Sequence, residues 1–123
     1  MKISRKDREI IFGKYGGKCA YCGCELQKGW HIDHIEPKFH NWSDDDVKIH
    51  LKKPRGNDDI ENYNPACPRC NRWKATYTIE QFRKEISLQT ERLKRDSASY
   101  RMALDYGLIT ENLESTKFYF EKT

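Results

Sequence analysis

The chain has 123 residues, of which 34% are charged and 37% hydrophobic, and its formal net charge is +4. This length suits one domain. A mean hydropathy of −0.98 indicates a small hydrophobic core, and small proteins commonly stabilise such a core with disulfides or a metal. No apolar stretch resembles a membrane span or a signal peptide, so we expect a cytoplasmic, reducing environment in which paired cysteines bind metal.

The charge is unevenly distributed along the chain. Lys and Arg outnumber Asp and Glu over residues 1–18 and 62–101, whereas residues 37–61 are slightly acidic. Clustered positive charge favours a polyanionic partner such as DNA. Exposed helix faces are also commonly charged without any partner, so charge alone does not decide between these two interpretations.

In chain order, the first predicted element is a helix over about residues 5–15. Ser4 precedes it as an N-cap and a glycine pair at 16–17 follows it, which are the residue types that begin and end helices. A cysteine-rich turn comes next, and apolar residues then predict a strand over residues 30–35. Residues 38–60 are rich in Asp, Pro and Gly, and they predict a loop.

The second half of the chain is predicted to be mainly helical. An extended piece at 62–66 leads into the stretch CPRCNRWK, residues 67–74, where we expect a helix to begin. Thr78 and Gln81 form a capping box, and apolar residues follow at helical spacing. The remaining predicted elements are a helix over 97–106 and a strand over the alternating stretch KFYFEK, residues 117–122.

Two C-x-x-C pairs predict a metal site. Each pair, Cys19 with Cys22 and Cys67 with Cys70, can bind a metal from one turn of the chain. Together the two pairs complete a four-thiolate site of the kind that zinc prefers. Such a closed shell is typical of structural zinc, because a catalytic zinc keeps an open position. A redox pair or buried thiols are the alternatives, and Cys24 competes with Cys22 as a ligand.

The stretch GWHIDHIEP, residues 29–37, places Asp33 and His34 where a buried strand normally carries apolar residues. Polar side chains that break a local pattern are often found at functional sites. Asn62 lies five residues before the second cysteine pair, and Asn71 directly follows it. Asn64 competes with Asn62, and the five-residue offset favours Asn62. Because zinc would tie the strand to the helix after the second pair, we expect Asp33, His34 and Asn71 to converge.

The stretches DHIEP, ENYNPAC and CPRCNRWK resemble, in order, the three parts of an HNH endonuclease framed by zinc knuckles. The resemblance covers about residues 15–76, and asparagine stands at the third position of the motif. It implies an α+β fold with a small ββα-metal, treble-clef-like core stapled by zinc, an N-terminal helix and a helical extension over about 78–123. All of these would form a single domain, 1–123, similar to HNH proteins of bacteria and bacteriophages.

The resemblance also implies the role of each site residue. His34 would act as general base on water, and Asp33 and Asn71 would hold a catalytic Mg²⁺ or Mn²⁺ through oxygen atoms. Asn62 would hold the loop that orients His34. Because neighbouring strand residues point to opposite sides, Asp33 and His34 cannot both act from a flat strand, so we expect a bend there. The candidates for phosphate contacts are Arg69, Arg72 and Lys74.

Other interpretations stay open at this point. Zinc deaminases carry His-x-Glu and Pro-Cys-x-x-Cys, but here Ala66 separates Pro65 from the cysteine pair, and the first pair would have no role. A non-catalytic zinc-knuckle module for nucleic acids would not need the Asp-His pair. Trp73 and Tyr77 could stack on nucleic-acid bases, but their helical spacing favours a place in the core. A homodimer or a phage packaging partner would be compatible with the chain, and the sequence does not decide between them. It also does not show whether the protein nicks one strand or cuts both.

Overall fold

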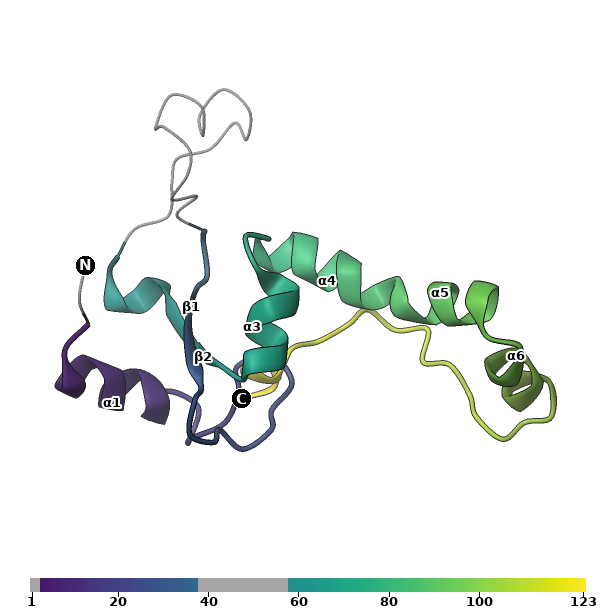
Figure 1. Cartoon of the computed structure of the whole chain (residues 1–123), viewed down its shortest axis with the longest axis horizontal. Helices are drawn as coiled ribbons and strands as arrows, with labels where there is room; N and C mark the ends of the chain where they lie inside the picture. The colour runs from purple at the N-terminus through teal and green to yellow at the C-terminus, as the bar shows by residue number, and fades with distance from the viewer. Residues whose placement is uncertain (1–2, 38–57) are drawn as a thin grey trace, which may run out of the picture.

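The computed structural model describes residues 3–37 and 58–123, so most of the predicted loop at 38–60 lies outside the described residues. The helices and strands are connected in the order drawn in Figure 1. They are α1 (Arg5–Gly13), β1 (His31–His34), the 3-10 helix η1 (Ile60–Asn62), β2 (Tyr63–Ala66), α3 (Pro68–Lys74), α4 (Ile79–Ser87), α5 (Gln89–Asp96), α6 (Ala98–Asp105) and the 3-10 helix η2 (Tyr119–Lys122).

Strands β1 and β2 form an antiparallel pair, and α3 packs beside them (Figure 1). The register places Asp33 opposite Asn64 and His34 opposite Tyr63. Helix α3 begins directly after β2 because Cys67 caps it and a proline, which needs no backbone N–H partner, stands at its first position. The resulting ββα unit, with helices before and after it, confirms the predicted α+β class.

The turn that carries the first cysteine pair is fixed against β2. The amide of Ala20 donates to the carbonyl oxygen of Pro65 at 2.9 Å, and Lys18 forms an isolated bridge with Glu25. Next to this turn, the ring of Tyr21 meets those of Phe82 and Phe118 edge-on, each with 5.4 Å between centroids. These three buried rings join the first knuckle, α4 and the C-terminal segment in one core.

The C-terminal segment folds back onto the knuckle and does not form the predicted strand at 117–122. The amides of Tyr119 and Phe120 donate to the carbonyl oxygens of Tyr21 and Ala20 at 3.0 and 2.8 Å. These carbonyls belong to a turn and offer no strand edge to extend, so the segment closes as η2. The alternation that suggested a strand instead turns Phe118 and Phe120 toward the same aromatic core.

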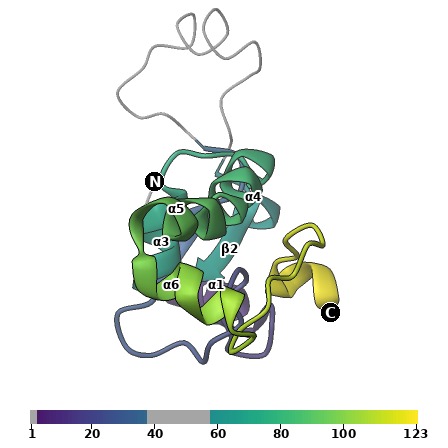
Figure 2. The same cartoon turned by 90° about the vertical axis from the view of Figure 1, so that its right-hand side faces the viewer.

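Helices α4, α5 and α6 extend to one side of the ββα unit (Figure 1), so α5 and α6 lie in front of it when the molecule is viewed from that side (Figure 2). The capping box of Thr78 and Gln81 is present at the start of α4, as predicted. Ser97 caps α6, which lies within the predicted range 97–106. In the part of the chain that the structure describes, every helix is too short or too polar to cross a lipid bilayer.

Candidate metal centre and active site

The four cysteines of the two C-x-x-C pairs come together between the first knuckle and the start of α3. Their sulfur atoms, those of Cys19, Cys22, Cys67 and Cys70, all lie within 4.8 Å of one another. The sulfurs of Cys22 and Cys67 are 3.9 Å apart, close to the roughly 3.8 Å edge of a tetrahedron built with zinc–sulfur bonds of about 2.3 Å. The donor set and its spacing therefore fit zinc, and Cys24 is not part of the group.

Backbone amides and a neighbouring thiol donate hydrogen bonds to sulfurs of this group. The amide of Tyr21 donates to the sulfur of Cys19, and the amide of Cys70 donates to the sulfur of Cys67, both at 3.4 Å. A hydrogen bond from Cys70 is the main cause that lowers the pKa of Cys19 to about 4. The same hydrogen bond raises the pKa of Cys70. Because metals bind the thiolate form, a metal that enters the site would displace the proton that these two sulfurs share.

Asp33 is 4% exposed and lies in a buried polar network. Its carboxylate accepts a hydrogen bond from the hydroxyl of Tyr21 and faces the ammonium of Lys74 at 3.2 and 3.1 Å. The same ammonium donates to the carbonyl oxygen of His34 at 2.8 Å. Burial raises the pKa of Asp33, and the charge of Lys74 acts in the opposite direction. One cation thus fixes both residues of the Asp-His pair.

The network extends across the sheet through Asn64, which the sequence offered only as an alternative to Asn62, and through Lys14, which the sequence analysis did not single out. The side-chain amide of Asn64 donates to the hydroxyl of Tyr21 at 3.3 Å, and Lys14 donates to the side-chain oxygen of Asn64 at 3.2 Å. Asn64 stands opposite Asp33 in the strand pair. A buried asparagine in a strand needs a partner, and this was the signal that could have pointed to Asn64.

His34 lies on the other face of β1, with its side chain 25% exposed. Its Nε2 atom is 3.1 Å from a carboxylate oxygen of Asp58, and its ring meets that of Tyr63 edge-on. The hydroxyl of Tyr63 donates to the same oxygen of Asp58 at 3.3 Å. Asp58 therefore orients the imidazole, and the sequence analysis missed it because it lies 24 residues from His34 at the end of a polar loop.

The expected bend between Asp33 and His34 is absent, since both residues belong to β1 and pair regularly with β2. The chain turns two residues later, at Glu36. There the side chain of Asn62 accepts from the amide of Glu36 at 2.9 Å and donates to its carbonyl oxygen at 3.1 Å. This two-point contact fastens the turn after His34 to the start of β2.

Helix α3 presents two different faces. Asn71 is half-buried and lies one turn before Lys74, so both residues are on the face of α3 that meets β1. Arg69 and Arg72 are exposed, as phosphate contacts must be. Lys74, which we expected to be a third phosphate contact, is instead 0% exposed. Its ammonium is turned inward because the buried carboxylate of Asp33 requires a counter-charge.

Trp73 and Tyr77 are also placed differently from the prediction. We expected both in the core, but Trp73 is 45% exposed and Tyr77 is exposed as well. The short α3 uses its inward positions for Cys70, Asn71 and Lys74, so Trp73 is left on the outer side. This arrangement places a large aromatic ring at the surface, next to Arg69 on the same helix.

The comparisons with known proteins point in one direction. The family model described as HNH endonuclease matches residues 19–76, from the first zinc-knuckle cysteine to the residue two positions after Lys74. The matched segment contains both cysteine pairs, Asp33, His34, Asn62 and Asn71. The comparison with curated proteins and the comparison with solved structures gave no match.

Proposed function

Because residues 19–76 belong to the HNH endonuclease family, we propose that this protein is a metal-dependent DNA endonuclease that hydrolyses phosphodiester bonds. The observation that carries the proposal is the arrangement around β1. A partly exposed histidine is held by a carboxylate on one face of β1. On the opposite face of the strand, a buried aspartate contacts Lys74 of α3, the helix that also carries Asn71. For both groups to act on one phosphate, the proposal requires β1 to bend at this pair when DNA binds. A general base held by an orienting group is the arrangement that hydrolysis by activated water requires.

His34 is proposed as the general base. An imidazole that donates from Nε2 to the carboxylate of Asp58 carries its lone pair on Nδ1, and this nitrogen takes the proton from the attacking water. Asp58 then stabilises the imidazolium that forms. Asn62 supports this step indirectly, because its contacts with Glu36 hold the turn that follows His34.

Asp33 and Asn71 are proposed to hold the catalytic cation. Their carboxylate and amide oxygens are the hard donors that Mg²⁺ or Mn²⁺ prefers. The carboxylate of Asp33 offers about four lone-pair positions, so its contacts with Tyr21 and Lys74 leave acceptor capacity for a cation. When bound, the cation supplies positive charge to the phosphate and to the leaving 3′ oxygen. Lys74 and Tyr21 keep Asp33 in place.

Zinc and the basic face of α3 complete the proposed enzyme. Structural zinc in the four-cysteine site would join the first knuckle to the start of α3, and thereby fix Asn71 relative to β1. Arg69 and Arg72 project from the exposed side of the same helix and are the proposed phosphate contacts. Lys74 has no part in this contact, since it is buried against Asp33.

The test is cleavage of supercoiled plasmid in the presence of Mg²⁺ or Mn²⁺. We expect the zinc-loaded protein to produce open-circular or linear DNA, and His34→Ala to lose this activity. General-base catalysis contributes about 10²- to 10⁴-fold, so the loss should be of that order. The matched control is His31→Ala, which removes an exposed histidine from the same strand and should cleave like the parent.

The other outcomes have equally clear meanings. If parent and His34→Ala both bind the plasmid and neither cleaves it with any divalent cation, the protein is a non-catalytic zinc-knuckle module. If both variants cleave equally, His34 is not the base. Zinc content and circular dichroism of each variant must match the parent, so that a loss of activity reports chemistry and not unfolding.

A further inference from the structure

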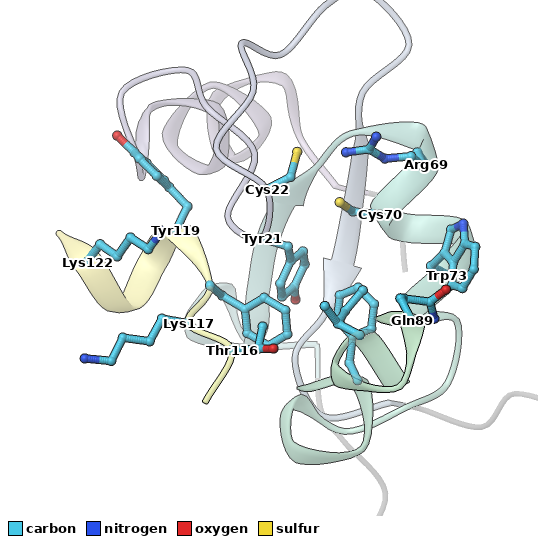
Figure 3. A pocket seen from close by; sticks show the side chains of 13 residues that line it. Tyr21, Cys22, Arg69, Cys70, Trp73, Gln89, Thr116, Lys117, Tyr119 and Lys122 are labelled. Atoms are coloured by element: carbon cyan, nitrogen blue, oxygen red, sulfur yellow. The ribbon is translucent and has the colours of Figure 1, made fainter. Parts of the chain in front are cut away.

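A cavity of about 410 Å³ lies on the outer side of α3, between this helix, α4 and the C-terminal segment 116–122 (Figure 3). This volume is within the range of about 300–1,000 Å³ that is usual for ligand pockets. Tyr21, Phe82 and Phe118, the aromatic core next to the zinc knuckle, form part of its wall. Cys22 and Cys70 of the four-cysteine site also line it, together with Arg69, whereas Trp73, Lys117 and Lys122 have no part in the proposals above.

Aromatic side chains give the cavity a surface on which a flat ligand can stack. Trp73 lies at its rim and is 45% exposed, while Tyr119 lies on the other side, with Tyr21 between them (Figure 3). An exposed tryptophan ring beside an apolar wall is the kind of surface on which nucleic-acid bases stack, and such stacking tolerates any base because every base has a π-face.

The polar groups of the cavity favour an anion. Arg69, Lys117 and Lys122 line it, and none of the described residues around it is an aspartate or a glutamate. The guanidinium of Arg69 has five N–H donors in a planar fork, which suits a phosphate. An apolar peptide would leave three cations without a partner, whereas a nucleotide uses both features.

The cavity is also connected to the candidate active site. Tyr21 lines the cavity with its ring, and its hydroxyl donates to the carboxylate of Asp33. Arg69 and Trp73 belong to α3, the helix that carries Asn71 on its opposite face. A strand that reaches the cavity is therefore bound by the same helix that contributes to the site at β1.

We propose that this cavity binds an unpaired nucleotide of the DNA substrate, with the base stacked on Trp73 and the phosphates held by Arg69, Lys117 and Lys122. The inference rests on the proposed nuclease function for the identity of the substrate. It adds a single-strand contact on the outer side of α3, and it predicts a preference for DNA with an unpaired segment next to the cleaved bond.

The test is binding of fluorescein-labelled oligothymidine, measured by fluorescence anisotropy with the full-length, zinc-loaded His34→Ala protein, which should not cut its ligand. Adding Trp73→Ala should weaken binding about tenfold, the usual scale for loss of one stacked base, and Trp73→Phe should restore most of it. Tyr106→Ala, which removes an exposed aromatic ring outside the cavity, is the control and should bind like the parent.

The basic residues are tested through the salt dependence of the same binding. Replacing Lys117 and Lys122 together by Gln should reduce the slope of log affinity against log salt by about 0.7 for each lost phosphate contact. The matched control replaces Lys6 and Lys28, two exposed lysines outside the cavity, and should have no more than the small effect of lower net charge. Each variant must keep the zinc content and melting temperature of its parent.

The outcomes separate this proposal from the nuclease proposal. If oligothymidine binding does not depend on Trp73, or if the Lys117 and Lys122 replacements do not reduce the salt slope, the nucleotide site is wrong even when plasmid is cleaved. This is also the result expected if the cavity takes an apolar peptide. If binding depends on both but plasmid stays intact, the cavity is a single-strand site and the nuclease proposal fails alone.

Discussion

Lys74 keeps its positive charge inside the protein, where a charge is tolerated only when it is paired. Its ammonium bonds the carboxylate of Asp33 and the carbonyl oxygen of His34. Lys74→Met retains the apolar stem but leaves the buried carboxylate without its counter-charge. We expect this change to lower the free energy of unfolding by about 3–5 kcal/mol, the usual cost of removing one partner of a buried pair.

Urea denaturation of the zinc-loaded variants measures this effect. The double variant Asp33→Asn with Lys74→Met removes both charges, so its loss of stability should be smaller than the sum of the two single losses. Arg72→Met is the control, since it removes an exposed cation from the same helix. Equal stability of Lys74→Met and the parent would mean that the buried pair contributes nothing to the fold.

The residues of the candidate site differ in how well the sequence predicted them. Asp33, His34, Asn62 and the cysteines stand in short local patterns, so the sequence alone marks them as candidates, and the structure brings the four cysteines together. Asp58 and Lys74 act on His34 and Asp33 across 24 and 41 residues, so only the fold shows their partners. Lys74 was expected at the surface because lysine is almost never fully buried unless it is paired.

Helices and strands were predicted correctly where neighbouring residues determine them, and wrongly where distant parts of the chain do. The start of α4 was predicted because its capping box is a local hydrogen-bond pattern. The C-terminal segment was predicted as a strand from its alternation, and this was wrong because its partners are the carbonyl groups of a turn about a hundred residues earlier in the chain. Periodicity alone could not provide that information.

The contact between α4 and η2 leads to a prediction about pH. Arg83 of α4 donates to both carboxylate oxygens of Glu121, at 2.7 and 3.0 Å, and this hydrogen bonding lowers the pKa of Glu121 below its ordinary value of 4.5. The folded state then binds fewer protons at Glu121 than the unfolded state. The stabilisation is therefore fully present above pH 4.5 and is lost as the pH falls through the lowered pKa.

Glu121→Gln should accordingly lower the melting temperature at neutral pH, and its difference from the parent should shrink as the pH falls below 4.5. Thermal unfolding across this pH range, monitored by circular dichroism, measures the difference in melting temperature. Both proteins have the same zinc site, so the effects of acid on that site largely cancel in the difference. The control is Glu80→Gln, because Glu80 also contacts Arg83 but its side chain is 79% exposed. A constant difference at all pH values would contradict the linkage.

At the scale of the whole molecule, zinc bound by the four cysteines would join the first knuckle to the start of α3. The described helices have at most nine residues, and isolated helices shorter than about 12 residues are marginal in water. The aromatic core of Tyr21, Phe82 and Phe118 lies directly beside the knuckle. If the knuckle opens, the core loses Tyr21, and the segments that pack on it lose their common support.

Removal of zinc should therefore unfold the protein and not merely loosen one loop. Binding of structural zinc contributes about 10–16 kcal/mol in zinc-finger peptides near neutral pH, more than the total stability of most small domains. We expect chelation to abolish most of the helical circular dichroism signal, and Cys22→Ser to lower both zinc content and melting temperature. Cys24→Ser is the matched control, because Cys24 lies two residues away but outside the group of four sulfurs. Loss of zinc in Cys24→Ser with retention in Cys22→Ser would make Cys24 the fourth ligand and would change the geometry of the first knuckle.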